Sequence, residues 1–277
     1  LVVARLSPHE KFDPLPVYIA LAEAQKGMAS GSRLHLMLYG NPPDDYSRRV
    51  FLQGAKALMP EVGLHHLPHE GSEARLAALS GADMFLFPID NLQESFGIAP
   101  VEAMAAGLPV IASDWDGIRD TVDGEAGIRV PTLAARAEHG LLLAHRLHGG
   151  TDSYTQYLAQ NSALTSIDLR AMTAAILALA RDPDRRARMS RAAVARARQL
   201  FDWSVVIPQM QDLFAELAAI RAKAKELAAI TDPEQRRVVE RLVENTQAHG
   251  ILHFPLGDPR QGIVHVVGPE NGATLPG

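Results

Sequence analysis

The sequence contains no cysteine and no long hydrophobic run, and each absence excludes a class of protein. Without cysteine there is no disulfide framework, no thiolate nucleophile and no cysteine-ligated zinc or iron–sulfur site. The longest apolar stretch, 171–180, is about half as long as a membrane span and is interrupted by Thr173. An excess of basic residues is also lacking, since the net charge is −5 at pH 7, so we expect no nucleic-acid partner.

The first residues, Leu1 to Ala4, carry no methionine, no charged segment and no cleavage site of the kind found in signal peptides. They read as part of a buried strand, so we expect the natural N-terminus to lie further upstream. Together with the absence of cysteine, this predicts a cytoplasmic protein.

The rest of the sequence has an ordinary globular composition, with 277 residues of which 47% are hydrophobic and 21% charged. Short apolar runs alternate with helical stretches. The expected strands are 1–6, 33–39, 62–67, 83–88, 109–113 and 127–130, and the expected helices between them are 14–26, 44–59, 72–79 and 97–106. This alternation predicts an α/β fold, a Rossmann-like parallel sheet with helices on both faces, which binds its ligand beyond the carboxyl ends of the strands.

From residue 134 onward we expect mainly helices. Asp182-Pro183 is typical of a helix start and predicts a helix over 184–200. Asp202 predicts a helix over 203–220. Thr231-Asp232-Pro233-Glu234 has the pattern of a capping box and predicts a helix that ends near 248. The arginines of 181–198 spread around much of their helix, which indicates a solvated surface rather than a membrane-lying one. We therefore expect one domain over 1–220 and a helical or irregular C-terminal extension over 221–277.

The stretch from Glu94 to Ile111 carries the strongest chemical signal. A strand ends at Pro88, a loop carries Glu94, and a helix starts near Gly97, so that Glu102 lies on the helix. The free N–H groups at the start of a helix, together with its dipole, form a site for phosphate. Two carboxylates beside such a site suit hydroxyl groups rather than an anion. The combination predicts a phosphorylated, hydroxyl-rich ligand, that is, a nucleotide sugar.

This stretch resembles the E-x7-E signature of family 4 glycosyltransferases, enzymes of the two-domain GT-B type. Glu94 and Glu102 have the spacing of that signature, and Arg5 followed by Lys11 resembles the Arg and Lys that follow the first strand of the family's C-terminal domain. The turn from Asp116 to Asp120, the loop from Asp123 to Gly127, and Phe201-Asp202-Trp203 also resemble family motifs. The likeness covers about 1–217.

The resemblance implies the C-terminal, donor-binding half of a GT-B glycosyltransferase that transfers a sugar, with retention, from a nucleotide-diphosphate sugar. It implies that Arg5 and Lys11 neutralise the diphosphate, that Glu94 contacts the transferred sugar and that Glu102 binds the ribose. The amides that would hold phosphate and sugar are those of Ser95, Phe96, Gly97 and Ile98. No metal or other cofactor is implied, because two cations and a helix N-terminus can stabilise the departing nucleotide.

Some positions depart from the family pattern, and an entire domain is missing. Ala4, Phe12 and Asp116 stand where glycine is usual, and Asp120 stands where Glu is usual. The family's acceptor-binding domain would precede Leu1, so we expect the isolated chain to be inactive. The acceptor, a sugar, lipid or small molecule, is not specified, and a peripheral membrane contact of the full-length protein stays open.

Several other interpretations stay open beside this one. Asp114-Trp115-Asp116 has the form of a metal-binding D-x-D, and the histidine groups 65–69 and 145–148 lack the carboxylates of a zinc site. A catalytically silent nucleotide-sugar-binding module and a GT-B nucleotide-sugar epimerase are the alternative functions. A phosphorylase would need a pyridoxal-phosphate lysine, for which there is no candidate motif.

Overall fold

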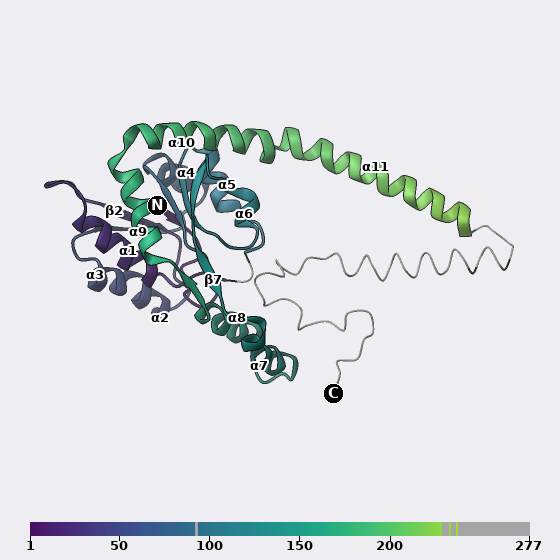
Figure 1. Cartoon of the computed structure of the whole chain (residues 1–277), viewed down its shortest axis with the longest axis horizontal. Coiled ribbons are helices and arrows are strands. Elements are labelled where there is room, and N and C mark those ends of the chain that lie inside the picture. The colour runs from purple at the N-terminus through teal and green to yellow at the C-terminus, as the bar shows by residue number, and fades with distance from the viewer. Residues whose placement is uncertain (92–93, 229–232, 234–236, 238–277) are drawn as a thin grey trace.

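A computed structural model describes residues 1–91, 94–228, 233 and 237 (Figure 1). At its centre lie two three-stranded parallel sheets, with strand orders β1-β2-β3 and β4-β5-β6. The strands are β1 (Val2–Val3), β2 (His35–Tyr39), β3 (Gly63–Leu67), β4 (Phe85–Phe87), β5 (Val110–Ser113) and β6 (Gly127–Val130). The Leu86 N–H donates to the Leu1 carbonyl at 2.8 Å and joins β1 to β4. The resulting order, β3-β2-β1-β4-β5-β6, is that of a Rossmann-type sheet, which confirms the predicted fold class.

The central strands are apolar because both faces of the sheet are covered. All residues of β4 and of β5 are buried, as expected for parallel strands between two helical layers. The predicted strand over 1–6 is wrong in length, since β1 ends at Val3. Beyond it the chain follows β2 through separate hydrogen bonds only, from Ala4 N–H to the Tyr39 carbonyl and from Leu6 N–H to the Asn41 carbonyl.

The helices between the strands match the predicted stretches closely. They are α1 (Leu15–Lys26), α2 (Asp45–Arg48), the π-helical segment η1 (Arg49–Gln53), α3 (Gly54–Leu58), α4 (Ser72–Ser80), α5 (Ile98–Ala105) and α6 (Ile118–Thr121). Crossovers between parallel strands are right-handed. The strand order reverses at β1 and β4, so α1 to α3 cover one face of the sheet and α5 covers the other.

Residues 132–167 form an addition that we did not predict as sheet. It comprises β7 (Thr132–Ala134), α7 (Ala137–His148), α8 (Tyr154–Ala163) and β8 (Thr165–Ile167). The two strands pair antiparallel with each other, and α7 and α8 project beside the sheet (Figure 1). Each strand has only three residues, so neither has the periodic pattern from which a strand can be predicted.

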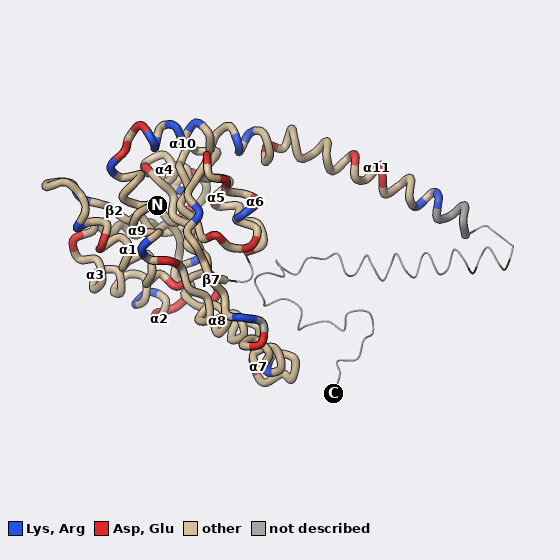
Figure 2. The backbone as a smooth tube through the Cα atoms, viewed as in Figure 1, with Lys and Arg blue, Asp and Glu red and all other residues tan. Residues whose placement is uncertain are grey.

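The last described elements are α9 (Leu169–Arg181), α10 (Pro183–Arg196), the π-helical segment η2 (Ala197–Phe201) and α11 (Trp203–Ala228). Helix α9 packs on α1, and α10 packs on α5. Asp182 accepts from the Arg185 N–H at 2.8 Å, which confirms the predicted helix start. Figure 2 shows several Lys or Arg positions along α10, and Arg188 and Arg191 are exposed. Helix α11 extends away from the sheet (Figure 1).

None of the described helices combines the length and the apolar character needed to cross a membrane. The predicted helix over 231–248 falls almost entirely outside the described residues, as does most of the extension that we expected over 221–277.

Candidate functional site

The candidate site lies where the strand order reverses. The loop after β1 carries Arg5 and Lys11, and the loop after β4 leads through Asp90 to Glu94. Because β1 and β4 are neighbours, the two loops leave the same edge of the sheet side by side. Open α/β sheets bind ligands at such a reversal of strand order, since adjacent loops diverge there and leave a crevice.

Lys11 and Glu94 form an ion pair between these two loops. Their side chains are only 20% and 16% exposed, so water screens the pair less than it would an exposed one. The Lys11 ammonium also lies 5.2 Å from the ring centroid of Phe87, at the end of β4. The structure therefore brings together two of the three residues that we expected to be catalytic.

Arg5, the third of these residues, lies apart. Its side chain is 65% exposed and pairs with Glu10 at 3.3 Å. Within the described residues its ion pair is with Glu10, and neither Glu94 nor Glu102 is its partner. Arg5 leaves β1 on the same loop as Lys11, where a long side chain can reach an incoming anion.

The start of α5 has the geometry that the sequence predicts. Gly97 is buried with φ +82° and precedes the helix, and a Cβ there would lie 2.7 Å from Ile118 Cδ1, so the position requires glycine. Ser95, Phe96 and Ile98 are exposed beside it. The first N–H groups of a helix have no partner within the helix, so those at this end are available to an anion.

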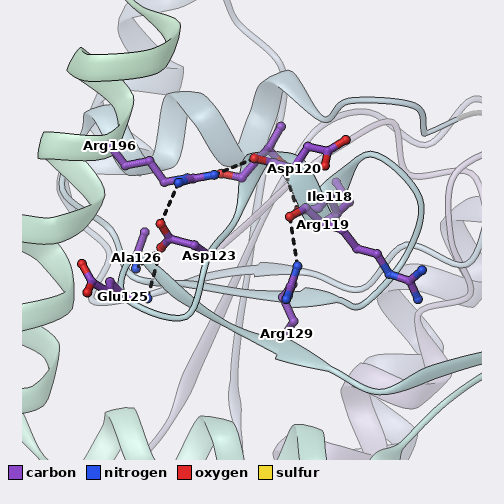
Figure 3. A network of polar contacts seen from close by, with 9 residues as sticks. Ile118, Arg119, Asp120, Asp123, Glu125, Ala126, Arg129 and Arg196 are labelled. Carbon is purple, nitrogen blue, oxygen red and sulfur yellow. Dashed lines mark hydrogen bonds and ion pairs between the residues drawn. The ribbon is translucent and has the colours of Figure 1, made fainter.

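The Asp116-Gly117 turn supports this loop from behind. A Cβ on Gly117 would lie 1.7 Å from the Ser95 carbonyl oxygen, so the two backbones are in direct contact. Arg196 of α10 holds the far end of α6 (Figure 3). Its guanidinium donates to the Thr121 carbonyl at 2.7 Å, the Asp120 carbonyl at 2.6 Å and the Asp123 carboxylate at 2.6 Å.

Glu102 lies on α5 and pairs with Arg75 of α4 at 3.1 Å. Both side chains are about one-third exposed, at 31% and 38%, so a ligand can reach them. Arg75 was not among the predicted site residues. Its only signal in the sequence is its place on the helix that crosses from β3 to β4, which brings it over the same edge of the sheet.

Asp90 is a second residue that sequence reasoning missed. It is 4% exposed, and its carboxylate accepts the Asp13 N–H at 3.1 Å. Burial raises the pKa of this carboxyl to about 7. Asp90 thereby links the loop of Lys11 to the loop of Glu94 a second time.

The D-x-D sequence takes part in ion pairs instead. Asp114 lies 3.1 Å from Arg119 and 3.6 Å from Arg129, and these cations compete with any metal for the carboxylate. Among the described residues no three His, Asp or Glu side chains gather as a metal site. His65 pairs with His35 at 2.9 Å and His66 with the Gly40 carbonyl at 2.9 Å.

The family of glycosyl transferases group 1 matches residues 2–144, just over half of the chain, including the crevice and both glutamates. The chain belongs to this family. Solved structures with a similar fold agree with this family assignment. Sucrose-phosphate synthase from Thermosynechococcus elongatus is 23% identical with a TM-score of 0.51, over 79% of this chain and 45% of that one. Anabaena HepE in complex with UDP and glucose is 19% identical with a TM-score of 0.50, and the match covers 78% of this chain and 48% of HepE. The chain thus spans less than half the length of either protein.

Proposed function

We propose that the chain is the donor-binding half of a family 4 glycosyltransferase of GT-B type. It transfers a sugar, with retention, from a nucleotide-diphosphate sugar to a sugar, lipid or small-molecule acceptor in the cytoplasm. The observation that carries this proposal is the Lys11–Glu94 pair at the reversal of strand order, directly beside the exposed start of α5. A cation, a carboxylate and a helix N-terminus are the groups that a sugar diphosphate requires.

Each group has one role in this proposal. The donor diphosphate takes Lys11 from Glu94 and draws in Arg5, so that two cations face the leaving group. Glu94, freed from its partner, accepts hydrogen bonds from the transferred sugar, while the amides of 95–98 donate to phosphate and sugar oxygens. Glu102 accepts from the ribose hydroxyls, with Arg75 holding its carboxylate in place. Fixed charges of this kind stabilise a departing diphosphate without a metal.

We divide the chain into a donor domain over 1–220 and an extension over 221–277. The acceptor is held by another domain, which agrees with the small share of each solved protein that the chain spans. Catalysis needs donor and acceptor in contact, and holding them in the reactive geometry lowers the activation barrier by about 7–11 kcal/mol. We therefore expect residues 1–277 alone to bind the donor and to transfer sugar no faster than background.

Thermal unfolding in the presence of EDTA tests the proposal. UDP is the first ligand to try, because Anabaena HepE has been solved with UDP and glucose, and GDP and ADP complete the panel. A ligand at 100 times its Kd adds about 2.7 kcal/mol to the free energy of unfolding of the chain, which raises Tm by roughly 5–10 °C. Lys11→Met should abolish the shift. Lys26→Met should not, because among the described residues Lys26 pairs with Glu23 of the same helix and both side chains are more than half exposed. A shift that requires Mg²⁺ or Mn²⁺ contradicts the metal-free mechanism.

A further inference from the structure

A second pocket lies next to the donor site, on the face of the sheet covered by α1. It has a volume of about 670 Å³ and is enclosed by the loop after β1, the start of α1, η1, and the α8–β8 part of the addition. Ligand pockets commonly have volumes of about 300–1,000 Å³. Thr155 of α8 donates to the Glu10 carboxylate at 3.4 Å, so the addition contacts the loop that carries Lys11.

The pocket walls are mainly apolar, and two buried oxygens in them lack hydrogen-bond partners. The apolar side chains include Leu15, Ile19, Val50, Ile167 and Leu169. Asp90 and Ser162 also line the pocket, and they are 4% and 8% exposed. Asp90 Oδ1 and Ser162 Oγ have no hydrogen-bond partner in the described part of the chain. Leaving a buried polar group unpaired costs about 1–3 kcal/mol, so a partner that enters the pocket gains this free energy.

The position of these two oxygens restricts the chemistry of the ligand. They come from different elements, the loop after β4 and helix α8, so a ligand that satisfies both bridges these two parts of the pocket wall. Anions are disfavoured, because Asp13 lines the pocket together with Asp90. A simple alkylammonium places its three N–H donors on one nitrogen, so all of its hydrogen bonds meet at a single point. A sugar carries hydroxyls around its ring edge and apolar C–H groups on its ring faces.

We propose that this pocket is a second binding site, for a neutral sugar moiety whose hydroxyls bond to Asp90 and Ser162. Both oxygens belong to residues that line the pocket, and each has almost no contact with solvent in the unliganded chain, so ligand binding requires both side chains to turn toward the pocket. In the unliganded chain the second carboxylate oxygen of Asp90 accepts the Asp13 N–H. This site goes beyond the proposed function, since its occupation does not depend on donor binding.

Ligand-observed NMR titration of the full chain tests the proposal with four probes. Three are the methyl α-glycosides of glucose, galactose and mannose, and the fourth is butylammonium. We expect saturable binding of at least one glycoside, and the same affinity in the presence of saturating UDP. Ala163 is exposed and lines the pocket, so Ala163→Phe fills the pocket from its open side. This change should lower the affinity more than tenfold. Ala187→Phe, at an exposed position on α10, is the matched control and should leave the affinity unchanged.

Ser162→Ala gives an independent reading that does not depend on steric blockage. Loss of one neutral hydrogen bond should weaken glycoside binding by about 2- to 13-fold, with UDP binding unchanged. The proposal is overturned by any of four results: no glycoside binds saturably, only butylammonium binds, UDP displaces the glycoside, or Ala163→Phe binds as well as Ala187→Phe. UDP binding is measured separately on each variant, so failure of the second site and failure of the donor site are distinguishable.

Discussion

Lys11 and Glu94 lie 83 residues apart in the sequence and form an ion pair across the reversal of strand order. Their loops leave neighbouring strands, and a second bond, from the Asp13 N–H to Asp90, holds the same two loops together. Under the proposed function, the cation that binds phosphate and the carboxylate that binds the sugar thus satisfy each other in the unliganded chain. Donor binding must exchange this pair for contacts with the ligand.

The two glutamates should differ in their effect on binding. Glu102→Ala removes the ribose contact, so affinity for UDP should fall by about 10- to 150-fold, the effect of losing a charged hydrogen bond of about 1.5–3 kcal/mol. Glu94→Ala should leave UDP binding nearly intact, because it frees Lys11, but should weaken binding of UDP-glucose. Calorimetric titration with both ligands checks this. Equal effects of the two substitutions on UDP binding contradict the assigned roles.

Gly117→Ala should disturb the donor site through the backbone. The new Cβ would lie 1.7 Å from the Ser95 carbonyl, so the loop before α5 must move. We expect a lower Tm and weaker binding of UDP-glucose. Gly124→Ala is the control, since a Cβ there meets no atom within 4 Å. If both variants bind UDP-glucose like the natural chain, the turn does not support the site.

Arg196→Ala should destabilise the chain by removing all three contacts at the end of α6 (Figure 3). Hydrogen bonds of a charged group contribute about 1.5–3 kcal/mol, which corresponds to a fall in Tm of roughly 3–12 °C. Arg188→Ala on the same helix is the control, because Arg188 is exposed. Differential scanning calorimetry of the two variants measures the difference. Equal Tm values for them would show that the network adds nothing to stability.

Asp90 should make stability depend on pH. Its pKa is about 7 in the folded chain and 3.8 as the ordinary value, so the folded state keeps a proton that the unfolded state releases. The contribution of Asp90 to the free energy of unfolding is therefore fully present below pH 4 and is lost as pH rises toward 7. The loss is on the order of a few kcal/mol. Asp90→Asn cannot ionise, so its Tm advantage over the natural chain should grow across this window and then level off.

Asp45→Asn provides the control for this pH series, since the Asp45 side chain is 90% exposed. Melting curves of the three proteins from pH 4 to pH 8 give the comparison. A difference between Asp90→Asn and the natural chain that stays constant over this range contradicts the burial-driven shift in the Asp90 pKa.

Local sequence patterns account for the features that depend only on neighbouring residues. Apolar strands alternate with helices whose starts carry capping residues or proline, such as Pro16 and Asp182, and these signals act within a few residues. Gly97 before α5 and the spacing of Glu94 and Glu102 are likewise local, so the position of this helix start was predictable. The order of elements then implied a parallel sheet, because helical crossovers join parallel strands.

Tertiary structure decided which residues meet and which are buried. Arg75 reaches Glu102, and Asp90 loses contact with water, only because separate segments pack over one edge of the sheet. The short strands β7 and β8 exist through pairing with each other, and the pocket beside α8 exists because residues of that addition and of α1 line a common space. Such contacts join residues far apart in the sequence, and their free energy comes from burial and pairing that no local pattern encodes.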